Sequence, residues 1–220
     1  VTTKCPFEII QIGALKVDSN YNNISTFNSL VKPSIYTEVH PFVEKLTKIT
    51  IDNLMFAKPF DKIFEDFSMF AKEKDTIFCV WGLCDMIELF RNIAYHKLDD
   101  SNISKKYINI QYYASKHLNT PNRKNISLQN AIELLNIPID KQFHDAFNDA
   151  CYTAKIFKKL RNESLKPQTY NSSQIIKNNK YRTKRHKKKI DIDGLIKHFE
   201  KMYSRKMTEE EISIITLSYK

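Results

Sequence analysis

The order of short apolar runs and helix-like segments along the first 160 residues is the feature that most constrains the fold. Residues 8–17 are apolar and rich in β-branched side chains, and a polar turn separates them from a second strand-like run at 25–33. This arrangement predicts two adjacent antiparallel strands. Apolar runs at 75–82 and 107–110 predict two further short strands.

Between and after these strands, apolar residues recur three and four positions apart, which is the spacing of an amphipathic helix. The clearest stripe, which we expect in the core, consists of Phe60, Ile63, Phe64, Phe67 and Phe70. Ser127 is placed to cap a later helix, and residues 145–160 form the last one. The order β-β-α-β-α-β-α-α predicts an α/β fold with a mixed β-sheet flanked by helices, and one further strand is expected at the front.

Positive charge is concentrated in one segment. Residues 166–189 contain nine Lys or Arg and no acidic residue, so this segment accounts for +9 of the net charge of +10. We interpret 164–190 as a basic linker that contacts nucleic acid; the alternative is a linker that only remains solvated. The residues expected to contact phosphates are Lys184, Arg185, Lys187, Lys188 and Lys189. A membrane surface is disfavoured, because no lipidation motif or apolar helix face flanks the segment.

The chain after residue 190 has a helical pattern of its own. Thr208 and Glu211 predict a capping box for the second of two short helices. A hairpin of about 30 residues is too small to be stable alone, so we expect it to dock on a protein partner or on the rest of the chain. The sequence therefore predicts three parts: a domain at 1–163, the basic linker at 164–190 and a helical segment at 191–220.

The four cysteines are Cys5, Cys79, Cys84 and Cys151, and they form neither a CxxC pair nor a cluster with histidine at zinc-ligand spacing. The first ten residues lack the basic start and apolar stretch of a secretory signal. We therefore expect reduced thiols and a cytoplasmic protein.

Three residues are candidates for chemistry. His144 and Asp149 lie at the entrance and in the early turns of the last predicted helix. An imidazole and a carboxylate in one cleft suit metal-assisted hydrolysis, although a histidine at a helix start is more often a cap or a surface group. Asp85 follows the strand predicted at 75–82, at the end where α/β sheets bind ligands, and its alternative role is to cap the next helix.

Trp81 lies four residues before Asp85. Its indole could stack on a terminal base, because base–aromatic stacking contributes ~1–3 kcal/mol. A buried tryptophan at a strand end is an equal alternative, and the sequence leaves both open.

Together these segments resemble the DEDDh group of 3′–5′ exonucleases, the DnaQ-like or RNase T-like family with a ribonuclease H-like fold. The resemblance runs from Val1 to about Leu160 and rests on the 8–17 strand, then LVKP, LTKIT and WGLCD, and finally HDAFNDACYTAKIF, which is similar to the motif HxAxxDAxxTA. The WG before the middle Asp is most similar to the KapD and ERI-type branch.

This resemblance implies a hydrolase that uses Mg²⁺ or Mn²⁺ in a two-metal site and removes nucleotides from single-stranded 3′ ends, with RNA favoured over DNA. Asp85 and Asp149 match metal ligands, and His144 matches the general base. Thr2 matches a residue that contacts the terminal nucleotide.

The sequence departs from the family at its first motif, D-x-E-x-T. Val1 and Thr2 match only the end of that motif, so its Asp and Glu are expected immediately before Val1. Glu8 is expected to pair with a surface lysine rather than replace them. With only Asp85 and Asp149, the chain is expected to bind metal poorly and cleave little. The alternatives are therefore a catalytically inactive nucleic-acid-binding module with the same fold, or a structural adaptor that uses the C-terminal hairpin.

Overall fold

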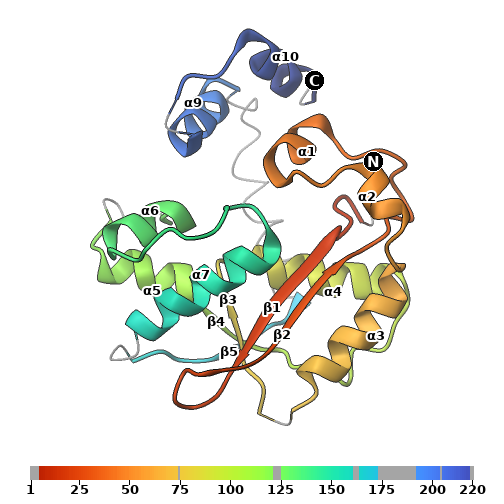
Figure 1. Cartoon of the computed structure of the whole chain (residues 1–220), viewed down its shortest axis with the longest axis vertical. Helices are drawn as coiled ribbons and strands as arrows, with labels where there is room; N and C mark the ends of the chain where they lie inside the picture. The colour runs from red at the N-terminus through yellow and green to blue at the C-terminus, as the bar shows by residue number, and fades with distance from the viewer. Residues whose placement is uncertain are drawn as a thin grey trace. The chain divides into compact units, whose positions relative to one another are not determined.

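The computed structural model describes residues 5–73, 75–120, 125–160, 164–172, 192–203 and 205–218 (Figure 1). The chain divides into two compact units, Val1–Asn171 and Ser172–Lys220.

The strands of the first unit form two ladders. β1 (Gln11–Val17) pairs antiparallel with β2 (Asn23–Leu30), as the sequence predicted. The turn between them is held by Asp18, whose carboxylate accepts the Asn20 and Asn22 backbone N–H groups at 2.8 Å. In the second ladder β3 (Phe78–Val80) runs parallel to β4 (Lys106–Asn109), and β5 (Gln168–Thr169) is antiparallel to β4. The pairing is therefore mixed, as predicted, although among the described residues no hydrogen-bonded ladder joins β1–β2 to β3–β5.

Seven helices are described between these strands and around them. They are α1 (Pro41–Thr47), α2 (Ile51–Met55), α3 (Phe60–Ala71), α4 (Cys84–Tyr95), α5 (Ile110–His117), α6 (Leu128–Leu134) and α7 (Ala146–Lys159). Ser127 caps α6 as predicted, because its side chain accepts the Asn130 N–H. The predicted stripe of α3 is buried except for Phe70, which is half-buried and packs on Phe27 with ring centroids 5.6 Å apart.

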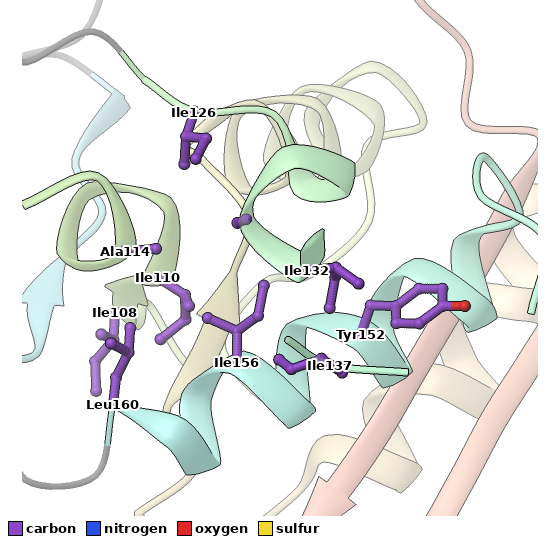
Figure 2. Close-up of a cluster of buried hydrophobic side chains, with 10 residues drawn as sticks. Ile108, Ile110, Ala114, Ile126, Ile132, Ile137, Tyr152, Ile156 and Leu160 are labelled. Carbon is purple, nitrogen blue, oxygen red and sulfur yellow. The ribbon is translucent and has the colours of Figure 1, made fainter. Parts of the chain in front are cut away.

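A cluster of buried hydrophobic side chains lies where α5, α6 and α7 meet β4 (Figure 2). Its members are Ile108, Ile110, Ala114, Ile126, Ala131, Ile132, Ile137, Tyr152, Ile156 and Leu160. Tyr152 is fully buried, and its hydroxyl points away from the aliphatic side chains of the cluster (Figure 2). This cluster fixes α7, which carries Asp149 and directly follows the turn that holds His144.

The segment that follows α7 is held against the first unit. Tyr170 is buried and stacks on Phe90 with ring centroids 4.7 Å apart, and its N–H donates to the Lys105 carbonyl. The predicted basic linker therefore begins with residues that include β5. Because β5 is antiparallel to β4, the chain leaves this unit at the end of β4 opposite to Asn109.

In the second unit, α9 (Ile192–Tyr203) precedes α10 (Glu209–Ser218). The predicted capping box is confirmed: the Thr208 N–H donates to the Glu211 carboxylate at 2.9 Å, and the Glu211 N–H donates to the Thr208 hydroxyl at 3.4 Å. Arg205 also pairs with Glu211, at 2.8 Å. Within the described ranges of both units, no helix has the length and apolar character needed to cross a bilayer.

Candidate active site

Asp85 is placed by a tight turn between β3 and α4. β3 ends at Val80, and Gly82 has a φ of 98°, a conformation that favours glycine. Leu83 is the N-cap of α4 and Asp85 lies in its first turn, so the alternative role of Asp85 as the N-cap is wrong. A hydrogen bond from the Trp81 backbone to Asp85 lowers the pKa of its carboxyl group, but the loss of hydration is the larger effect.

The carboxyl groups of Asp85 and Asp149 both have raised pKa values. Asp85 is accessible to solvent, yet the protein around its carboxylate displaces enough water to raise its pKa to about 6. Burial likewise raises the pKa of Asp149 to about 6, and the charges of Asp145 and Asp85 contribute to this rise. The negative charge of Asp85 is thus a minor cause of the raised pKa of Asp149, and a bound cation would offset it.

His144 lies beside Asp149. Its backbone N–H donates to Asp149 Oδ1 at 3.2 Å, and its φ of 68° turns the chain into α7. Asp145, not His144, is the N-cap of α7, and His144 is half-buried, so the cap and surface alternatives for His144 are not supported. Burial lowers the pKa of the imidazole, which keeps it neutral at pH 7, the form that a general base requires.

The loop before His144 is held by Tyr152 of α7. The Tyr152 hydroxyl accepts the N–H groups of Asp140 (3.1 Å) and Lys141 (2.8 Å) and donates to the Lys141 carbonyl at 2.8 Å. Phe143 stacks on the same ring, with centroids 4.7 Å apart. His144 is thus fixed on its N-terminal side by a core residue.

Two residues of β1 that the sequence analysis missed also contact this turn. Gln11 hydrogen-bonds to Asp145 and to the Ala146 N–H. At Gly13, a Cβ atom would overlap the backbone of Ala146 and Phe147. The sequence did contain a signal for Gly13: the chain has only three glycines, so each is a candidate for a position that cannot hold a side chain.

The remaining candidates fall in different places. Trp81 is half-buried against the hydrophobic cluster of Figure 2, and its indole N–H has no partner among the described residues, so base stacking stays a prediction. Thr2 and the basic residues of 180–189 lie outside the described residues. No ion pair between Glu8 and a lysine is found among the described residues; its carboxylate instead accepts the backbone N–H groups of Ser34, Ile35 and Tyr36.

The carboxylate oxygens of Asp85 and Asp149 are suitable ligands for a hard divalent cation. Both oxygens of Asp145 accept hydrogen bonds, whereas no hydrogen bond to Asp149 Oδ2 is found among the described residues. Magnesium is commonly bound by one or two carboxylates, with water and substrate phosphates completing its shell. Asp85 and Asp149 could supply that pair. The described part of the chain has no group of three or more His, Cys, Asp or Glu that could hold a metal, so a second cation would need further ligands.

The chain is similar to a known protein family and to several solved structures. The RNase T family model, described as an exonuclease, matches residues 2–157. The nuclease domain of 3′hExo, a DEDDh family member solved with rAMP, has a TM-score of 0.65 at 23% identity, over 74% of this chain and 86% of that one. A 3′-exonuclease studied for recognition of a histone mRNA stem-loop has a TM-score of 0.63 at 20% identity, over 76% and 84%.

Cell-death related nuclease 4 has a TM-score of 0.63 at 19% identity, over 76% of this chain and 61% of that one. At these identities the solved structures establish the fold, which is the ribonuclease H-like fold of the DEDDh exonucleases, as predicted. No curated protein sequence gave a significant match.

Proposed function

Because the chain belongs to the RNase T family of exonucleases, we propose that it is a divalent-metal-dependent 3′–5′ exonuclease. Its substrates would be single-stranded 3′ ends, with RNA preferred over DNA. The observation that carries the proposal is the pair of Asp85 and Asp149, with raised pKa values, next to a half-buried neutral His144.

In this proposal Asp85 and Asp149 hold Mg²⁺ or Mn²⁺, the cations that suit oxygen ligands. The bound cation supplies positive charge to the scissile phosphate and makes water easier to deprotonate. His144 accepts the proton of the attacking water, since its imidazole is neutral. Its backbone hydrogen bond to Asp149 keeps the base and the carboxylate at a fixed separation.

The polymer would extend beyond this site. Trp81 and Thr2 are proposed to contact the terminal nucleotide. The basic linker, 164–190, is proposed to hold the more distant phosphates, mainly through Lys184, Arg185, Lys187, Lys188 and Lys189. The described part of the linker passes through β5 toward the end of β4 opposite to the site. A chain of about 20 residues can span at most ~70 Å, which is enough for residues 184–189 to reach a polymer bound at the site.

Three further parts of the proposal rest on sequence. The domain is assigned to 1–163, and residues 191–220 form a helical segment that docks on a partner or on the chain itself. The cysteine spacing supports a cytoplasmic location. One observation favours a second candidate function, a catalytically inactive nucleic-acid-binding module: the described part of the chain has no group of three potential metal ligands.

The test uses the chain with the Asp and Glu of the first motif restored before Val1, and follows degradation of 5′-labelled single-stranded RNA and DNA with and without Mg²⁺. The exonuclease shortens the labelled strand stepwise from its 3′ end. Both Asp85→Ala and Asp149→Ala abolish this shortening, because each removes a metal ligand. His144→Ala slows it by ~10²–10⁴-fold, the usual contribution of a general base. Asp99→Asn, an exposed surface change, serves as the control.

Binding of the same oligonucleotides without any shortening would favour the inactive module. Equal digestion by the parent and Asp149→Ala would show that the site is assigned wrongly.

A further inference from the structure

β1 presents an unusual pair of residues to the start of α7. Residues two apart on a strand lie on the same face, so Gln11 and Gly13 face α7 together. Gly13 leaves no room for a side chain, because a Cβ there would overlap the Ala146 and Phe147 backbone. The first turn of α7 therefore rests directly on β1.

Gln11 makes three hydrogen bonds at this contact. Its Oε1 accepts the Ala146 N–H at 3.0 Å, and its Nε2 donates to Asp145 Oδ2 at 2.8 Å and to Asn28 Oδ1 at 3.0 Å. The orientation of the amide follows from Ala146, whose N–H can only meet an oxygen. Ala146 begins α7, and the first N–H groups of a helix have no partner within it. Gln11 therefore supplies a cap from a distant strand.

These hydrogen bonds determine which carboxylate of the turn is left to bind a cation. Asp145 Oδ1 accepts the Asn148 N–H at 2.9 Å and Oδ2 accepts Gln11, so Asp145 is fully engaged. Asp149 is then the carboxylate of this turn that remains for a cation. His144 directly precedes Asp145, and its N–H is bound to Asp149. One amide group thus anchors the turn that carries both His144 and Asp149.

We infer that Gln11 is a positioning residue of the nuclease site: it holds the start of α7 so that His144 and Asp149 keep their productive geometry. The inference rests on the proposed function. A displacement of ~1 Å in a catalytic constellation can cost about 10²-fold in rate, so loss of this anchor should reduce turnover without weakening the binding of the polymer.

The test variant is Gln11→Met, which keeps the length of the side chain and removes its donors and acceptor. With the Asp and Glu of the first motif restored before Val1, we expect kcat on a single-stranded oligonucleotide to fall ~10–100-fold, with KM changed less than ~3-fold. Independently of activity, the Ala146 amide should exchange with solvent at least ~10-fold faster, because its hydrogen-bond acceptor is gone.

Two controls separate positioning from general stability. Asn28→Ala removes the hydrogen bond on the β2 side of the same amide and should leave kcat within ~2-fold of the parent. Ile132→Val destabilises the buried cluster and should leave both kcat and Ala146 exchange near parental values.

Unchanged Ala146 exchange in Gln11→Met would overturn the structural basis of the inference. Faster exchange with parental kcat, or an equal loss of kcat in Asn28→Ala, would overturn the positioning role. A parent that binds oligonucleotides but never shortens them would refute the proposed function instead, and the exchange measurement would still decide whether Gln11 holds the turn.

Discussion

The carboxylates of the candidate site should make the metal-free protein less stable at neutral pH. The pKa of Asp149 is about 6 in the folded chain, against 3.8 for an unperturbed aspartate. The folded state therefore binds this proton more tightly, and the free energy of unfolding falls as the pH rises from about 4 to 6. Asp149 lowers the free energy of unfolding most above pH 6, where the folded protein must hold the carboxylate in its charged form.

The substitution that tests this is Asp149→Asn, which keeps an oxygen able to accept the His144 N–H. The full shift in pKa corresponds to ~3 kcal/mol, and partial solvent screening reduces this to the order of 1–2 kcal/mol. We expect Asp149→Asn to be more stable than the parent by that amount at pH 8, and by much less at pH 4.5. Mn²⁺ should stabilise the parent and not the variant.

Urea unfolding in the presence of a chelator measures the effect, with the fluorescence of Trp81, the single tryptophan, as the probe. Asp140→Asn is a control of opposite sign, because the hydrogen bond and charge of Lys155 lower the pKa of Asp140. That variant should lose stability at pH 8. Equal unfolding free energies for Asp149→Asn and the parent at pH 8, or a larger gain at pH 4.5, would refute the reasoning.

Two further predictions rest on contacts described above, and a third rests on the charge of the basic linker. Gly13→Ala should destabilise the fold by ~1–3 kcal/mol, because the added Cβ displaces the start of α7, and thermal unfolding with Ala14→Gly as a comparison checks it. Tyr152→Phe should lose ~1–3 kcal/mol, since the Asp140 and Lys141 N–H groups lose their acceptor; unchanged urea stability would contradict this. Neutralising the five basic residues named between 184 and 189 should flatten the slope of log K against log salt by about 3, if roughly four of them contact single-strand phosphates. Filter binding measures that slope, and turnover of a trinucleotide, too short to reach the linker, should not change.

Features encoded locally could be predicted from the sequence. The spacing of phenylalanine predicted α3, and single polar residues predicted the cap of α6 at Ser127 and the capping box at Thr208. His144 and Asp149 lie five residues apart and share one turn, so a short motif was enough to place them together.

Features that depend on contacts between distant segments could not be predicted. Gln11 and Ala146 are 135 positions apart, and nothing near either residue shows that they meet. Glu8 illustrates the same limit: a charged residue at the start of a strand is typically exposed, but here the loop after β2 turns three backbone N–H groups toward it. Only the folded chain shows which partner a polar side chain has.

The backbone of His144 gives a way to recognise whether related chains are under selection for chemistry. A φ of 68° is disfavoured for a side chain with a Cβ by about 1 kcal/mol, and glycine avoids that cost. Chains of this fold that no longer need an imidazole should therefore drift to glycine at this position and gain stability. Lys48 and Lys97 keep side chains at similar φ values, 63° and 55°, so the informative comparison is whether related chains retain His144 more often than these two residues.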